Sequence, residues 1–251
     1  MKRQAFGLFL GAALVTGAVW GPAAATPANI AAAVADPGRP QADKDRDAAR
    51  KPAAMLEFAR VRPGETVVDF MPGAGYFTRL FSVAVGPKGK VYAFIPTEVA
   101  KFSKKPLPAN GSAPDPAHPN VTALVAPVMD FSTPRPVDLI WTSQNYHDLH
   151  DPFMGPADMA KFDAAVYRAL KPGGVFIVLD HSALPGSGTS ATNTLHRIDA
   201  ALVKKEVTAA GFVFVSESNV LRNPADTRTL KVFDPAIRGH TDQFIYKFRK
   251  P

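Results

Sequence analysis

The sequence of 251 residues contains no cysteine. This absence excludes disulfides, thiolate zinc sites, iron–sulfur clusters, cysteine nucleophiles and a lipid-modified cysteine. Charged residues are also few, at 20%, whereas hydrophobic residues make up 46%, a fraction too high for a disordered chain. The chain therefore folds around a core, and its chemistry must be done by side chains other than cysteine.

Long hydrophobic runs are absent except for one, which spans Ala5 to Trp20. Met1-Lys2-Arg3 precedes this run and the small residues Pro22-Ala23-Ala24-Ala25 follow it. The run is shorter than the ~20 residues that a membrane-spanning helix needs. The pattern predicts a signal peptide over residues 1–25, with an uncleaved anchor as the alternative. We therefore expect a periplasmic or secreted protein without stable membrane insertion after cleavage.

The net charge of +7 becomes +5 without the signal peptide, which carries Lys2 and Arg3 and no acid. The remaining positive charge is concentrated in residues 226–251. A basic segment of this kind could contact nucleic acid, but no basic patch is interleaved with aromatic residues. We therefore interpret it as a solvated strand and loop, and we expect no nucleic-acid partner.

The rest of the chain divides into a short leader and one domain. Residues 26–44 are rich in alanine and proline and are expected to form a flexible linker, followed by a domain over residues 45–251. Apolar segments rich in β-branched residues predict strands that alternate with helical segments. Strands are expected at 66–70, 90–95, 121–126, 136–142, 175–180, 211–217 and 242–248, and helices at 45–60 (interrupted at Pro52), 76–85, 156–170 and 196–210. The alternation indicates an α/β fold with a mostly parallel sheet covered on both faces.

The first predicted strand ends at Asp69 and is followed by the loop Phe70-Met71-Pro72-Gly73-Ala74-Gly75. Glycines at this position let the backbone approach a ligand, and the next helix offers free N–H groups at its start. A dinucleotide fingerprint needs a third glycine where this chain has Thr78. The loop therefore argues against a nicotinamide-dependent oxidoreductase.

Three segments resemble the class I S-adenosylmethionine-dependent methyltransferases: VVDFMPGAGYFTRLFS (67–82), VDLIWTSQNYHDLH (137–150) and RALKPGGVFIVLDHS (168–182). The resemblance covers about residues 46–251, and the chain is similar to a group of secreted bacterial predicted methyltransferases. It implies a Rossmann-like fold with a seven-stranded sheet and S-adenosylmethionine as cofactor. The residues that it assigns to cofactor binding are Asp69, Met71, Gly73, Gly75, Tyr76, Glu98, Asp130 (near the adenine amine) and Asn145.

Two positions depart from the family pattern. Met71 stands in place of the first glycine, so we expect the loop to take a less open path there. Ile95 stands where the family usually has the acid that binds the ribose hydroxyls. Glu98 could substitute for that acid, or it could be a solvated residue in the first turn of the following helix.

The candidate catalytic residues follow the fourth and fifth predicted strands: Tyr146, His147, Asp180 and His181. Methyl transfer depends mainly on holding the nucleophile in line with the methyl group, and a base helps only when the nucleophile is protonated. His147 could be a base or a substrate contact, and Asp180 could tune a neighbouring imidazole or only cap a turn. His147 and His150 could also be read as metal ligands, but we expect no metal.

The long connection before the last strand contains Arg222 and Arg228, and the predicted helix before it begins at His196. These three residues are candidates for substrate binding, with a salt-bridged surface loop as the alternative for the arginines. The sequence thus predicts an S-adenosylmethionine-dependent methyltransferase acting on a small molecule. The rival hypothesis is a non-catalytic, exported ligand-binding protein that retains the fold.

Overall fold

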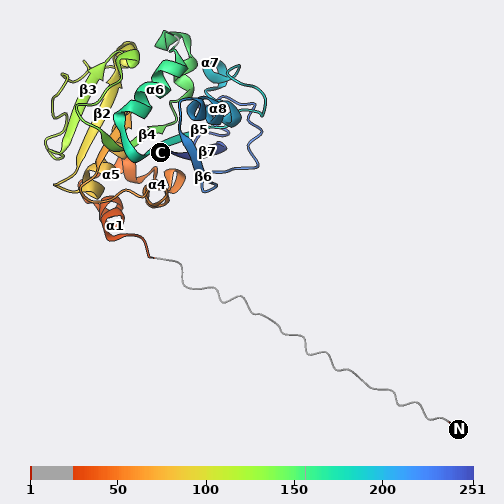
Figure 1. The fold of residues 1–251 in the computed structure, drawn as a ribbon, viewed down its shortest axis with the longest axis horizontal. Helices are drawn as coiled ribbons and strands as arrows, with labels where there is room; N and C mark the ends of the chain where they lie inside the picture. The colour runs from red at the N-terminus through yellow and green to blue at the C-terminus, as the bar shows by residue number, and fades with distance from the viewer. Residues whose placement is uncertain (2–24, 156) are drawn as a thin grey trace.

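The computed structural model describes residue 1 and residues 25–155 and 157–251, which form a seven-stranded sheet in the order β3-β2-β1-β4-β5-β7-β6 (Figure 1). The strands are β1 (Thr66–Phe70), β2 (Lys90–Pro96), β3 (Val121–Ala126), β4 (Val137–Ser143), β5 (Leu170–His181), β6 (Val213–Ser218) and β7 (Gln243–Arg249). Neighbouring strands from β3 to β5 run parallel, and β7 is antiparallel to both β5 and β6. The prediction of a mostly parallel, seven-stranded sheet is confirmed.

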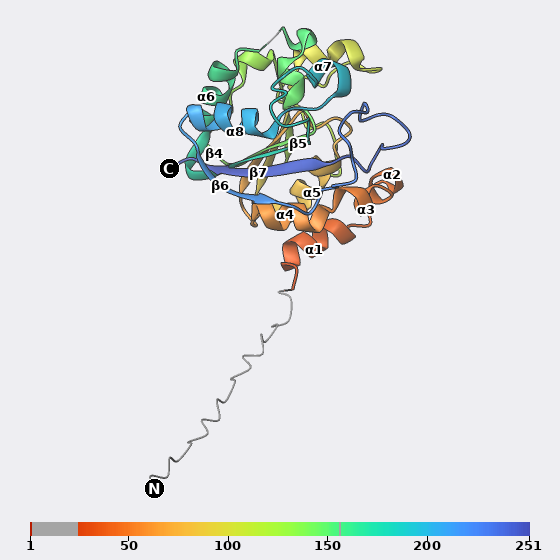
Figure 2. The same ribbon diagram turned by 90° about the vertical axis from the view of Figure 1, so that its right-hand side faces the viewer.

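Helices cover both faces of the sheet, as Figure 2 shows. On one face lie α1 (Ala28–Ala35), α4 (Pro52–Ala59) and α5 (Tyr76–Val85), and on the other lie α6 (Met159–Ala169) and α8 (Ala200–Ala209). Every residue of β1 is buried, because a parallel strand between two helical layers meets solvent on neither face. The apolar strand sequences thus produce a three-layer molecule with a core on each side of the sheet.

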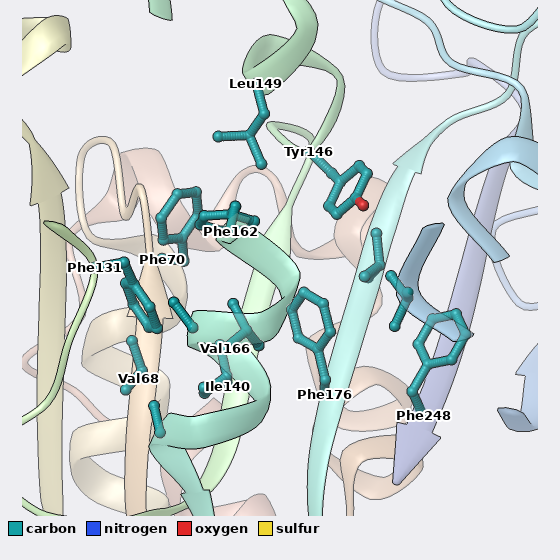
Figure 3. Close-up of a cluster of buried hydrophobic side chains, with 14 of the residues drawn as sticks. Val68, Phe70, Phe131, Ile140, Tyr146, Leu149, Phe162, Val166, Phe176 and Phe248 are labelled. Atoms are coloured by element: carbon teal, nitrogen blue, oxygen red, sulfur yellow. The ribbon is translucent and has the colours of Figure 1, made fainter. Parts of the chain in front are cut away.

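The core on the α6 side is built around aromatic rings from different elements (Figure 3). The ring centroid of Phe70 lies 5.1 Å from that of Phe162 and 5.9 Å from that of Phe131. Because Phe70 is the last residue of β1, this packing fixes the end of the strand from which the glycine loop departs.

The segment over residues 26–44 is not the flexible linker that its composition suggested. It contains α1 and the short α2 (Gln41–Lys44), and Ile30 and Ala33 of α1 are buried in the core on the α5 side. The side chain of Asn29 donates hydrogen bonds to the carbonyls of Val61 (3.0 Å) and Ala84 (3.1 Å). The folded domain therefore starts at α1 rather than at residue 45.

Two of the predicted helices are divided in the structure. The segment 45–60 forms α3 (Asp47–Arg50) and α4, separated by Lys51 in a left-handed conformation before Pro52. The segment 196–210 is not one helix: α7 (Thr192–Leu195) ends at His196, and α8 begins after Asp199, whose side chain accepts a hydrogen bond from the Ala201 N–H. His196 therefore ends one helix instead of beginning another.

The predicted signal peptide falls almost entirely on residues 2–24, which lie outside the described part of the chain. No helix among the described residues is long and apolar enough to cross a bilayer.

Candidate active site

The carboxyl ends of β1 and β4 lie side by side at the point where the strand order reverses. Open α/β sheets bind ligands in the crevice at this position. The residues that leave the two strands, Met71 and Gln144, both adopt left-handed conformations (φ 53° and 62°). Met71 therefore keeps the backbone conformation that glycine favours, so the predicted change in the path of the loop is not seen in its φ angle.

The glycine loop between β1 and α5 forms one wall of a cavity of about 370 Å³. Gly73 and Gly75 line it and both have positive φ (55° and 81°). A Cβ on Gly75 would lie 2.9 Å from the Arg79 guanidinium, which binds the Ala74 carbonyl and the Asp43 carboxylate. A Cβ on Gly73 would meet no other heavy atom within 4 Å, so the loop leaves open space at that residue.

Asp69 is buried beneath this loop, and its carboxylate accepts a hydrogen bond from the Thr78 hydroxyl (2.6 Å). Burial raises the pKa of Asp69 to about 7, although Thr78 and the nearby Arg50 and Arg79 act in the opposite direction. This hydrogen bond connects the end of β1 to the first turn of α5 and so fixes the two ends of the glycine loop. Asp69 therefore supports the glycine loop and does not line the cavity.

The end of β2 supplies no acid to this cavity, because the side chain there is Ile95. Glu98 is engaged elsewhere: its carboxylate accepts the Val128 N–H (3.0 and 3.1 Å) and so joins the loops after β2 and β3. Asp130 is exposed at the end of the short helix that begins at Val128. The carboxylate that does line the cavity is Asp115, which sequence reasoning missed.

Asp115 comes from the loop between β2 and β3 and pairs with Nδ1 of His118 (2.8 Å). The pair lowers the pKa of Asp115, chiefly through its hydrogen bond with His118. Pro108 and Pro114 of the same loop also line the cavity. A Pro-rich loop with one Asp gave no recognisable motif, so only the position of Asp115 in the wall of this cavity indicates a role.

Three other predicted site residues are buried, with their polar groups committed to other partners. Asn145 donates from Nδ2 to the carbonyls of Phe70 and Met71 (both 3.1 Å) and so joins the loops after β4 and β1. The Tyr76 hydroxyl donates to Asp47 (2.6 Å) and thereby attaches α3 to α5. The hydroxyl of Tyr146 points into the α6-side core (Figure 3), where it donates to Asp163 (2.9 Å) and lies 3.2 Å from the carboxylate of Glu206.

His147 and Asp180 form a buried pair between the loops after β4 and β5. Asp180 accepts from His147 twice, at Nδ1 and at the backbone N–H (both 2.8 Å). Burial alone would lower the pKa of His147, but the charges of Asp180 and Asp148 outweigh it and raise that pKa to about 10. The same pairing overcomes burial at Asp180 and lowers its pKa. The sequence placed the two residues in loops at the same edge of the sheet, but their direct contact is seen only in the structure.

His181 lines a second cavity, of about 660 Å³, which is also lined by the loop before β7. Burial lowers the pKa of His181 to about 3, so its ring is neutral, and Nδ1 lies 2.8 Å from the Thr241 hydroxyl. The other residues of this wall are mostly polar and cationic: Asp45, Arg46, Ala49, Arg50, Gln144, Val232, Phe233, Arg238, Gly239, His240, Thr241 and Gln243. Sequence reasoning missed Arg46, Arg50 and Arg238, because they come from separate segments of the chain.

The predicted substrate-binding arginines are instead bound to one buried acid. Arg222 and Arg228 both pair with Asp242 (2.8 and 2.9 Å). The nearby Arg197 is fully buried and pairs with Asp226 (2.8 Å). These ion pairs fix the long loop before β7. They also give each arginine a carboxylate partner, so no bound ligand is needed to explain why the arginines are there. His196 lies beside His147, with 3.3 Å between its Nδ1 and Nε2 of His147.

Comparison with known proteins finds relatives in one enzyme class. The chain is 29% identical over 180 residues to a ubiquinone/menaquinone biosynthesis C-methyltransferase UbiE from Teredinibacter turnerae, which covers 70% of this chain and 67% of that protein. It is 30% identical over 131 residues to the protein of that name from Shewanella woodyi, covering 51% of this chain and 47% of the relative. No family model matches the sequence.

Solved structures share the fold at lower sequence identity. A S-adenosylmethionine-dependent methyltransferase from Aquifex aeolicus superposes with a TM-score of 0.54 and 21% identity, over 85% of this chain and 99% of that one. A second from Mesorhizobium loti gives 0.54 and 16%, over 82% and 100%. The [4+2]-cyclase SpnF also gives 0.54, at 17% identity over 84% and 81% of the two chains, so the fold itself is not tied to one reaction.

The fold is shared with S-adenosylmethionine-dependent methyltransferases of known structure, and the sequence relatives are methyltransferases, so fold and relatives together support a class I S-adenosylmethionine-dependent methyltransferase. The cofactor of that class is S-adenosylmethionine. Within the class, the sequence relatives are the UbiE C-methyltransferases, although much of their length has no counterpart in the aligned region.

Proposed function

We propose that this protein transfers a methyl group from S-adenosylmethionine to a small, anionic acceptor molecule. The observation that carries the proposal is the cavity formed by the glycine loop, the end of β2 and Asp115 at the reversal point of the sheet. When bound, the cofactor supplies an activated sulfonium methyl group, so the chain has mainly to bind and orient the two reactants.

The residues of this cavity fit such a cofactor. The open space at Gly73 lets the backbone approach it closely. Asp115 offers carboxylate oxygens for hydroxyl groups, which takes over the task of the acid that Ile95 replaces. In this proposal Asn145 is a positioning residue, since it holds the loops after β1 and β4 together.

The second cavity supports an anionic acceptor. Arg46, Arg50 and Arg238 line it, against the single acid Asp45. The guanidinium of Arg50 lies 4.8 Å from the ring centroid of Tyr76 and donates to the side chain of Gln144 (2.9 Å). These two contacts hold it beside the carboxyl end of β4. A neutral His181 would orient the acceptor by a hydrogen bond to its free ring nitrogen.

Calorimetric titration of the mature chain with S-adenosylmethionine and S-adenosylhomocysteine tests the cofactor site. We expect both to bind and Gly73→Arg to abolish binding, because the new side chain would enter the cavity. Arg168→Ala, on the exposed side of α6, is the matched control and should bind normally. Absence of binding to the wild-type chain at millimolar ligand would contradict the proposal and would favour the non-catalytic alternative, which the methyltransferase relatives do not support.

We also propose that the chain is exported, on the charged and apolar pattern of residues 1–25. Mass spectrometry of the N-terminus of protein recovered from the periplasm or medium is the test. A mature chain that begins near Thr26 is expected. An intact Met1 on exported protein would instead indicate an uncleaved anchor.

A further inference from the structure

Three side chains outside the proposed cofactor cavity converge on one point. The atoms are Nε2 of His147, Oδ1 of Asp148 and Nδ1 of His196. Nε2 of His147 lies 3.3 Å from each of the other two, and those two are 3.9 Å apart. His147 and Asp148 belong to the short helix after β4, whereas His196 ends α7, so the tertiary fold brings them together.

The separations match those of ligands around a small metal ion. Zinc binds imidazole nitrogen and carboxylate oxygen at about 2.0–2.2 Å, so ligands at the corners of a tetrahedron lie about 3.3–3.6 Å apart. Two of the three separations have this value, and the third, 3.9 Å, requires only a small movement of His196 or Asp148. Two imidazoles and a carboxylate are also ligands that zinc favours.

His147 is oriented as a metal-ligating histidine usually is. Its Nδ1 is bonded to Asp180, which leaves Nε2 directed at Asp148 and His196. A carboxylate behind a ligating imidazole fixes the ring and increases its basicity. Asp180 is fully buried and also accepts the His147 backbone N–H, so this orientation is rigid.

The backbone of His196 has an uncommon conformation. Its φ of 54° is left-handed, a region that few residues other than glycine occupy, although histidine does so more often than most. Its ring packs on Phe233, with 4.9 Å between ring centroids, and on His147 at 5.4 Å. Unusual backbone conformations of this kind tend to occur at functional sites.

A buried acid beside the cluster supplies independent support. Asp151 is 1% exposed, and neither of its carboxylate oxygens has a hydrogen-bond partner among the residues that the structure describes. The hydroxyl of its neighbour Thr192 donates to the Thr189 carbonyl instead. Burial raises the pKa of Asp151, whereas the charges of His147 and His196 act in the opposite direction. A buried carboxylate without a partner is costly unless a cation lies nearby.

We propose that His147, Asp148 and His196 form a zinc site with three protein ligands, supported by Asp180 and by the charge of Asp151. His147 is buried, whereas the side chains of His196 and Asp148 are 23% and 17% exposed, so the ion is reached from their side. The fourth position then faces solvent, as in zinc sites that bind a water molecule or a substrate group. Phe233 connects this site to the second cavity, since it lines that cavity and packs on His196.

The proposal does not depend on methyl transfer and is tested without S-adenosylmethionine. The mature chain is stripped with a chelator and titrated with Zn²⁺ by calorimetry, and bound metal is counted by elemental mass spectrometry. We expect one zinc per chain. Cobalt in place of zinc should give the intense visible absorption of a tetrahedral ion.

Two variants test the ligands. His196→Asn removes one ligand while keeping a residue type that tolerates the left-handed conformation, so the fold should be retained. Asp148→Asn removes the second. Each should weaken zinc binding by about tenfold or more, and Asp180→Asn by roughly 10–100-fold through the orientation of His147. His150→Gln is the matched control, because His150 lies on the same short helix but pairs with Glu206 (3.3 Å).

The proposal is overturned if the stripped chain takes up no stoichiometric zinc, or if His196→Asn and Asp148→Asn bind it as tightly as the wild type. Equal weakening in His150→Gln would also overturn the assignment. Failure of cofactor binding in the separate titration would leave these results unchanged.

Discussion

At the scale of single residues, the glycine loop depends on two different physical requirements. Gly73 and Gly75 both need positive φ, but only Gly75 is also approached by another group, the Arg79 guanidinium. Alanine at each position separates the two requirements. Both variants bear the cost of the left-handed conformation, and only Gly75→Ala also disturbs Arg79.

We expect Gly73→Ala to lower the free energy of unfolding by about 1 kcal/mol, the cost of a left-handed alanine. Gly75→Ala should cost roughly 1 kcal/mol more, because its Cβ displaces Arg79 from Asp43 and Ala74. Urea denaturation of both variants measures the difference. Equal losses would show that Arg79 moves away freely.

The buried Asp69 predicts a dependence of stability on pH. Its pKa is raised from 3.8 to about 7 in the folded chain, so the folded state holds this proton more tightly than the unfolded state does. The contribution of Asp69 to stability therefore falls as pH rises from about 4 to about 7. Relative to Asp69→Asn, the wild type should lose on the order of 2 kcal/mol between pH 5 and pH 8.

Denaturation of both proteins at the two pH values tests this, with Asp69→Asn retaining an acceptor for the Thr78 hydroxyl. Asp163, whose pKa burial raises to about 8, titrates in the same direction in both proteins and cancels in the comparison. Parallel pH profiles would contradict a raised pKa at Asp69.

At the scale of elements, α1 shows where composition misleads. Residues 26–44 were predicted to be a linker because alanine and proline dominate them. The spacing of Ile30, Ala33 and Val34 was the available signal, since these positions lie on one face of a helix. The strands were predictable because β1, β2 and β4 are apolar runs bounded by turn residues. The division of the 196–210 segment was readable in part from Asp199, a favoured N-cap residue.

We expect Ile30→Ala to cost roughly 2–4 kcal/mol in the free energy of unfolding, the usual range for a fully buried aliphatic side chain. Ala32→Ser, on the exposed face of the same helix, should change it by less than about 0.5 kcal/mol. Chemical denaturation of the mature chain measures both. A small effect of Ile30→Ala would mean that α1 is not part of the cooperative core.

The candidate site was predictable only as far as local motifs reach. The glycine loop follows from a strand end that the sequence reveals, and so do the positions of the loops that carry His147 and Asp180, but not the contact between these two side chains. The meeting of His147 with His196, and of Arg46 with Arg238, requires loops that are far apart in the chain to fold together. No local pattern encodes such contacts. Tyr146 was misleading in the same way, because only the structure shows that its hydroxyl faces the core.

At the scale of the whole molecule, a ligand that binds only the folded chain must raise its stability. At 100 times its dissociation constant, S-adenosylhomocysteine should add about 2.7 kcal/mol to the free energy of unfolding. For a domain of this size, that corresponds to a rise in Tm of roughly 5–10 °C. Differential scanning calorimetry with and without ligand measures it, and Gly73→Arg should show no shift.

The position of β7 determines the order in which the molecule can be completed. It is the last of the seven described strands along the chain, yet it lies between β5 and β6 in the sheet. Until residues 243–249 have left the ribosome, β6 has no neighbour to pair with and one edge of β5 stays open. The sheet therefore cannot close before residues 243–249 are available to pair with both β5 and β6.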